Sequence, residues 1–291
     1  MSTVRNLNSD FTLPGTTLTL KRMGYGTMQL PGPHVMGPPL DRDNALAVLR
    51  EAVLLGANHI DTAEFYGPHV SNELIYEALS PYNDDLVIIT KVGVERGNDG
   101  SWNFDCSKAG LIKQVNENLT SLGVDTLDVV NLRLGNAEGA DNRSLAEPLN
   151  TLVELQKQGL INHIGLSCVS SAQYDEAVTI ANIVCVQNQY NLIYRHDDEL
   201  IDRLAKEGVA YVPFFPLGGF SPLQSSILSD VANEVGATAK QVALAWLLHR
   251  SPNILVIAGT SSIEHLHENL GSMNVQLSSE QLMKLNNIAD K

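Results

Sequence analysis

Short apolar runs alternate with amphipathic stretches from about residue 20 to the end of this chain. The runs that read as strands are 23–28, 57–62, 86–92, 127–132, 163–168, 183–188, 209–214 and 254–259. The stretches between them include 43–56, 71–82, 107–123 and 146–159, with apolar residues at the i, i+3, i+4 and i+7 spacing of helices. Eight nearly continuous apolar strands separated by helices predict an α/β fold, a closed parallel (β/α)8 TIM barrel. A β-hairpin that turns at Pro14 and Gly15 is expected to precede it.

No linker-like segment interrupts this alternation, so residues 1–291 are expected to form a single domain. The formal net charge is −14, and no long run of Lys or Arg is present. This balance argues against nucleic acid or an anionic membrane as a partner, because both attract basic surfaces.

Cysteine usage and the N-terminal sequence bear on the compartment. Cys106, Cys168 and Cys185 are too few and too scattered for a disulfide framework, and they lack metal-ligand spacing. There is no signal-like segment at the N-terminus and no apolar run near the ~18 residues of a membrane span. We therefore expect a cytoplasmic protein without a metal site.

Three residues with catalytic potential fall at the ends of neighbouring expected strands. The segment 59–67 (HIDTAEFYG) closes the second strand and brings Asp61 and Tyr66, while Lys91 ends the third strand. Taken singly, these residues have ordinary explanations as a helix cap, loop packing and a solvated strand end. Together they favour a catalytic site, because the carboxyl ends of barrel strands meet at the face where such sites are built.

The segments NHIDTAEFYG and ITKVG resemble the signature of the aldo-keto reductases. The segments MGYGTM, HIGLSCVS, VQNQYN, FFPLGGF and IAGTSSIEHLHEN resemble further motifs of that family, in the family's order, so the resemblance covers essentially the whole chain. Within the family, NLR after the fourth strand, YVPFFPLGGF and AGTSSIEHL are most similar to bacterial pyridoxal reductases.

This resemblance implies reversible hydride transfer between NADPH and a small aldehyde or ketone, with pyridoxal as one candidate. Tyr66 would protonate the developing alkoxide, Lys91 would polarise Tyr66, and Asp61 would hold Lys91. A free phenol has a pKa of about 10, too high for an effective acid at neutral pH. An ammonium about 4 Å away is worth roughly 4 kcal/mol at an effective dielectric of about 20, or about 3 pKa units, so we expect the pKa of Tyr66 to lie near neutrality.

The resemblance also implies the residues that hold the cofactor. Gly26, Thr27 and Asp61 would lie near the nicotinamide riboside, with Ser167 and Gln187 on the carboxamide and Phe214 stacked on the ring. Phe215, Pro216 and Leu217 would follow the pyrophosphate, and the adenosine end would meet Ser261, Ser262, His265, Glu268 and Asn269. Without the ordered series of motifs, the Phe, Leu and Gln positions would read as core packing.

The chain departs from the family pattern at several positions. Arg133 stands where the family usually has a catalytic His; Arg cannot deprotonate, but it could hold a carbonyl or an anionic group, or turn outward into a surface ion pair. Cys168 replaces a common Asn, and Phe214 a frequent Tyr. The loop 259–262 lacks the Lys that often meets the 2′-phosphate, and His265 replaces a frequent Arg, so NADPH is expected and NADH is possible.

Two other functions are compatible with these residues. Lys91 could be the nucleophile of a Schiff-base aldolase on the same barrel, although pairing with Asp61 would keep it protonated. The chain could also be a non-catalytic NADP-binding regulator of the same fold. For the reductase we expect a small-molecule carbonyl substrate and a monomer, with an oligomer as the open alternative.

Overall fold

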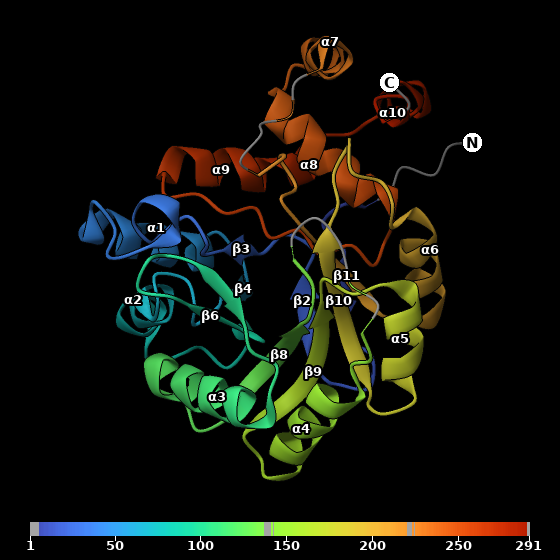
Figure 1. The fold of residues 1–291 in the computed structure, drawn as a ribbon. Helices are drawn as coiled ribbons and strands as arrows, with labels where there is room; N and C mark the ends of the chain where they lie inside the picture. The colour runs from blue at the N-terminus through green and yellow to red at the C-terminus, as the bar shows by residue number, and fades with distance from the viewer. Residues whose placement is uncertain (1–5, 137–140, 142, 220–222, 224, 290–291) are drawn as a thin grey trace.

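Seven parallel strands lie side by side in the order β11-β10-β9-β8-β5-β4-β3, with helices outside them (Figure 1). The computed structural model describes residues 6–136, 141, 143–219, 223 and 225–289. The strands are β3 (Tyr25–Gly26), β4 (His59–Asp61), β5 (Val87–Val92), β8 (Leu127–Arg133), β9 (Ile161–Ser167), β10 (Ile183–Gln189) and β11 (Ala210–Phe214). Each of them falls within or overlaps a segment that the sequence predicted as a strand.

The eighth predicted strand, 254–259, closes the barrel through single bridges rather than a continuous ladder. Ile254 bridges Tyr211 on one side and Val256 bridges Met23 on the other, both in parallel. Closure brings two backbones unusually near each other: a Cβ at Gly26 would lie 2.6 Å from the carbonyl oxygen of Ile257. Glycine is required there because any side chain would force the two segments apart.

The predicted N-terminal hairpin is confirmed as β1 (Asp10–Thr12) and β2 (Thr19–Lys21), which pair antiparallel. Leu13 and Leu20 are buried together with the apolar side chains of the barrel interior. The backbone amide of Lys21 donates to Asn58, which precedes β4. The hairpin therefore covers the amino ends of the strands and leaves their carboxyl ends open.

The helices surround the strands, and apolar side chains between the two layers form the larger core cluster. They are α1 (Arg42–Leu54), α2 (Val70–Leu79), α3 (Lys108–Leu122), α4 (Ala146–Lys157), α5 (Ser171–Val178), α6 (Asp198–Glu207), α7 (Ser226–Val235), α8 (Ala239–Arg250), α9 (Ile263–Gly271) and α10 (Ser279–Asn286), with 3-10 turns at Pro33–Val35 and Ser272–Asn274. Side-chain caps start several of them: Ser107 accepts a hydrogen bond from the Gly110 amide and begins α3, which ends at the left-handed Gly123. The four helices predicted from apolar spacing are confirmed within a few residues.

An antiparallel hairpin inserted after β5 was not predicted from the sequence. Its strands are β6 (Val94–Arg96) and β7 (Trp102–Phe104). Arg96 donates hydrogen bonds to the carbonyl oxygens of His34 and Val35, which ties this hairpin to the loop after β3. Two loops are thereby joined above the carboxyl ends of the strands.

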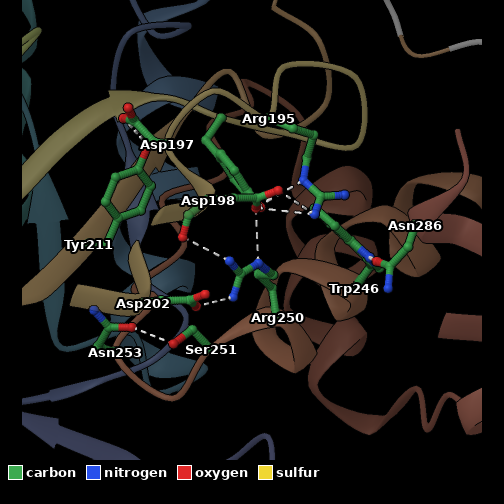
Figure 2. Close-up of polar contacts among 11 residues, drawn as sticks. Arg195, Asp197, Asp198, Asp202, Tyr211, Trp246, Arg250, Ser251, Asn253 and Asn286 are labelled. Carbon is green, nitrogen blue, oxygen red and sulfur yellow. Dashed lines mark hydrogen bonds and ion pairs between the residues drawn. The ribbon is translucent and has the colours of Figure 1, made fainter. Parts of the chain in front are cut away.

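A partly buried ion network joins α6 to α8 (Figure 2). Asp198, in the first turn of α6, accepts from Arg195 and from Arg250, the last residue of α8, and Arg250 also pairs with Asp202. An acidic group at a helix start and a basic group at a helix end both complement the helix dipole. Trp246, also on α8, lies 4.7 Å from the guanidinium of Arg195 and donates to Asn286 of α10. Among the described helices, none has the length and hydropathy that a membrane crossing requires.

Candidate active site

Apart from Tyr66, the predicted catalytic and carboxamide-binding residues lie at the carboxyl ends of five barrel strands. Asp61, Arg133 and Ser167 are the last residues of β4, β8 and β9, while Lys91 and Gln187 lie near the ends of β5 and β10. The strand register pairs Arg133 with Ser167, and Ser167 with Gln187. Because the strands are parallel and in this register, their end residues share one face of the barrel.

Asp61 is the centre of a buried polar cluster. Its Oδ1 accepts a hydrogen bond from Lys91 Nζ at 2.5 Å, and its Oδ2 accepts one from Gln187 Nε2 at 2.7 Å. Lys91 also donates to the carbonyl oxygen of Thr62 at 2.9 Å. Both charged side chains are almost fully buried, which is tolerable only because they are paired and hydrogen-bonded.

Tyr66 lies in the loop after β4, with Lys91 Nζ 5.1 Å from the centroid of its ring. The phenol is buried, and burial raises its pKa above the ordinary value. The charges of Lys91 and Arg133 lower the pKa, but Asp61 raises it, and the net direction is upward. The expectation of a pKa near neutrality was therefore wrong, because it neglected both desolvation and the carboxylate that offsets Lys91.

Lys91 is held in the ammonium form. Burial by itself lowers its pKa, but the Asp61 carboxylate and the Tyr66 phenol outweigh burial, so the pKa lies above the ordinary value. A Schiff-base nucleophile requires a free amine at working pH. The electrostatics of the described site therefore weigh against an aldolase that uses Lys91.

A cavity of about 1000 Å³ opens at this face of the barrel. Most of the residues predicted for catalysis and cofactor binding line it. They are Gly26, Asp61, Tyr66, Lys91, Arg133, Ser167, Gln187, Phe214, Phe215, Pro216, Leu217 and Ser261. Gly26 of β3 and residues of the closing segment 257–261 line the cavity together with the catalytic strands.

The other predicted cofactor-binding residues lie outside the cavity lining. Thr27 is buried and bonded to Thr62, and Ser262 accepts from the backbone amide of His265 as the cap of α9. The carboxylate of Glu268 accepts from Thr238 at 2.6 Å, and Asn269 is buried. The role of these residues in cofactor binding stays a prediction.

One buried polar atom at the cavity fits a nicotinamide carboxamide. Because Gln187 gives its amide nitrogen to Asp61, its Oε1 is left buried with no hydrogen-bond partner among the described residues. An orphaned buried acceptor is costly unless a donor reaches it. An amide NH₂ group in the cavity would supply that donor, and Ser167 on the adjacent strand offers a hydroxyl beside it.

Arg133 is half-buried and lines the cavity, and it forms no ion pair with a carboxylate of the described residues. Its Nε lies 3.5 Å from the carbonyl oxygen of Gly135, and its guanidinium lies 5.7 Å from the centroid of the Trp102 ring.

Next to Ser167, Cys168 is buried with φ +55°, and burial raises the pKa of its thiol. This agrees with a packing role for Cys168 rather than a redox role.

Sequence reasoning missed several residues that line the cavity. Trp102 and Phe104 come from the β6–β7 hairpin, and Asp41 and Asn44 come from the start of α1. The apolar alternation of 102–104 after the glycines of 97–100 was a usable hairpin signal. Nothing in the sequence indicated that this hairpin bends over the barrel mouth.

The model of the Aldo/keto reductase family matches residues 22–290. The chain therefore belongs to this family and is an oxidoreductase, as the resemblance of its motifs predicted. Pyridoxine 4-dehydrogenase of Escherichia coli (strain K12) is 58% identical over 275 residues, which make up 94% of this chain and 96% of that protein.

Two solved structures show the same fold. The thermostable aldo-keto reductase Tm1743, in complex with the inhibitor epalrestat, is 29% identical with a TM-score of 0.82 and covers 96% of this chain and 99% of its own. An aldo-keto reductase from Klebsiella pneumoniae in complex with NADPH is 23% identical with a TM-score of 0.79, over 97% and 95% of the two chains. The predicted (β/α)8 barrel is confirmed, whereas the assignment of all 291 residues to one domain stays a prediction.

Proposed function

We propose that this protein reduces a small aldehyde or ketone with NADPH, and that Tyr66 donates the proton to the carbonyl oxygen. The observation that carries the proposal is the buried Asp61–Lys91 ion pair, which sits against the ring of Tyr66 on the wall of a large cavity. A buried ion pair costs desolvation energy, so its position beside a phenol is more readily explained by chemistry than by stability.

A bound nicotinamide nucleotide would supply the hydride that attacks the carbonyl carbon. As negative charge develops on the carbonyl oxygen, Tyr66 transfers its phenolic proton to that oxygen and becomes a phenolate. Lys91 stabilises the phenolate by its charge, and Asp61 keeps the ammonium in place and protonated. Water then returns a proton to Tyr66 before the next turnover.

NADPH is proposed as the cofactor because the residues that line the cavity fit it and because a protein of the same fold was solved with it. Gln187 Oε1 and Ser167 would take the carboxamide, and Phe214 through Leu217 would lie along the ring and pyrophosphate. The structure of the aldo-keto reductase from Klebsiella pneumoniae, which has the same fold, was solved in complex with NADPH. NADH remains the second candidate, because the adenosine end of the cavity offers hydroxyl and amide groups.

Pyridoxal is proposed as a substrate because the relative with 58% identity is a pyridoxine 4-dehydrogenase. That name describes the reverse direction, the oxidation of an alcohol, and the chemistry of Tyr66 is reversible: the phenolate accepts the proton that the phenol gives.

The test is the oxidation of NADPH, followed by absorbance, across a panel of aldehydes that includes pyridoxal and benzaldehyde. Turnover of several aldehydes by the wild type supports the proposal, and the same assay with NADH compares the cofactors. Tight NADPH binding without turnover of any aldehyde would favour a non-catalytic regulator. Trapping of Lys91 by borohydride in the presence of a carbonyl compound would favour an aldolase.

A further inference from the structure

The guanidinium of Arg133 carries a positive charge into the cavity that no described carboxylate neutralises. Its two Nη groups have no hydrogen-bond partner among the residues that the structure describes, and Nε makes one long contact to a backbone carbonyl. The two carboxylates that line the cavity are engaged elsewhere. Asp61 binds Lys91 and Gln187, and Asp41 caps α1 by accepting from the Asn44 amide.

Trp102 keeps this charge at the cavity without cancelling it. The indole lies beneath the guanidinium of Arg133 at 5.7 Å, and a cation–π contact orients a cation but leaves its charge free to bind an anion. The ring is itself held in place: Phe65 meets it edge-on at 5.5 Å, and the guanidinium of Arg96 lies 4.3 Å from its centroid. Arg96 is fixed in turn by the carbonyl oxygens of Val35 and Gly100.

Tyr66 and Arg133 both line the cavity, and a series of aromatic contacts connects them. Phe65 precedes Tyr66 and packs edge-on against it at 5.2 Å, so Trp102 connects the surroundings of Tyr66 to Arg133. The charge of Arg133 is also among those that act on the Tyr66 phenol. A substrate whose carbonyl reaches Tyr66 therefore brings a nearby substituent within reach of the guanidinium.

We infer that Arg133, oriented by Trp102, selects carbonyl substrates that carry an anionic oxygen close to the carbonyl group. The chemical class is an aldehyde with a carboxylate or phenolate substituent, and the guanidinium provides paired donors for such an oxygen. This inference rests on the proposed function for its catalytic consequence, but the binding of the anion does not depend on turnover.

Binding is tested with benzoate, an anion of the required class, by quenching of tryptophan fluorescence in the wild type, Arg133→Met and Arg133→Lys. Trp102 reports on the site, while Trp246 is buried in α8. We expect benzoate to bind Arg133→Met at least tenfold more weakly, with partial recovery in Arg133→Lys. The control is Arg203→Met, which makes the same charge change on α6 and should bind like the wild type. Equal affinity of Arg133→Met and the wild type would overturn the inference.

Selectivity is tested by comparing kcat/KM for 3-carboxybenzaldehyde and pyridoxal with that for benzaldehyde. The ratio of anionic to neutral substrate should fall at least tenfold in Arg133→Met and by a smaller factor in Trp102→Leu. Equal losses on all three substrates would contradict a role in selection. If the wild type reduces none of them, the proposed function fails, and the benzoate measurement still decides whether Arg133 binds an anion.

Discussion

Gln187 donates its side-chain amide to Asp61 at 2.7 Å across the interior of the barrel, between residues 126 positions apart in the chain. The strands that carry them, β10 and β4, are not neighbours in the sheet. The bond fixes the orientation of both groups: Asp61 can present only its other oxygen to Lys91, and Gln187 can present only its carbonyl oxygen to the cavity.

Gln187→Leu is expected to weaken NADPH binding by about five- to tenfold, the equivalent of about one neutral hydrogen bond. The leucine keeps the volume but removes the acceptor that a carboxamide would use. A fluorescence titration of the cofactor measures the change. Gln187→Glu keeps an acceptor but sets a second carboxylate against Asp61, so we expect it to bind no better than Gln187→Leu. Wild-type affinity in both variants would remove Gln187 from the cofactor site.

Tyr66→Phe should lower kcat by at least about 100-fold, because the reaction loses its general acid. The ring, its edge-on contact with Phe65 and its burial are retained, so the affinity for NADPH should stay within a few-fold. Single-turnover kinetics with a saturating aldehyde measure the loss of rate, and a cofactor titration measures the affinity for NADPH. Near-normal kcat would show that another group supplies the proton.

The Asp61–Lys91 pair should behave as a coupled unit in unfolding experiments. Lys91→Met leaves a buried carboxylate without its ammonium and should lower the unfolding free energy by about 3–5 kcal/mol. Asp61→Asn should also destabilise the fold, whereas the double variant should cost less than the sum of the two by at least about 1 kcal/mol. Urea unfolding of the wild type, the two single variants and the double variant measures the four free energies of this double-mutant cycle. Strict additivity would mean that the pair contributes no coupling.

His59 should make the protein sensitive to acid. It is fully buried in β4, and neither ring nitrogen has a hydrogen-bond partner among the described residues. Burial lowers its pKa from 6.5 to about 4, so below pH 6.5 the unfolded chain binds a proton that the folded chain resists. The unfolding free energy should therefore fall by about 3 kcal/mol between pH 6.5 and pH 4, and be unaffected by this group above pH 6.5.

His59→Gln, which cannot be protonated in this range, provides the comparison. The variant has its own packing cost, so the pH dependence rather than the absolute stability is compared. His163 also has a pKa lowered by burial, but it is present in both proteins and cancels in the difference. Parallel curves of unfolding free energy against pH would exclude His59 as a source of acid sensitivity.

NADPH should bind more tightly than NADH, but only moderately. Among the described residues that line the cavity, the lysine is Lys91 and the arginine is Arg133. Both lie at the ends of the catalytic strands. The part of the cavity that we propose for the adenosine has Ser261 and Asn44 instead, and neutral donors bind a phosphate less strongly than charged ones. Ser261→Ala should reduce NADPH affinity about five- to tenfold and leave NADH affinity nearly unchanged. An equal effect on both cofactors would place Ser261 away from the 2′-phosphate.

Much of this architecture could be predicted from local sequence patterns. The alternation of strands and helices, the hairpin around Gly15, and the positions of Asp61, Lys91 and Arg133 at strand ends all follow from patterns a few residues long. Hydrophobic periodicity determines which face of a segment is buried, and parallel packing then brings strand ends together. The eighth strand was also located correctly, although its pairing is reduced to bridges at Ile254 and Val256.

Other properties were decided only by the tertiary structure. The pKa of Tyr66 is raised by burial of the phenol and by the negative charge of Asp61 near it. Neither effect can be read from the spacing of these residues in the sequence. The bond from Gln187 to Asp61 spans the barrel, and the contact of Trp102 with Arg133 depends on how the β6–β7 hairpin bends over the mouth. Desolvation and side-chain contacts between distant segments arise only when the chain has closed into a barrel, so the sequence indicated which groups were present and the fold determined what they do to one another.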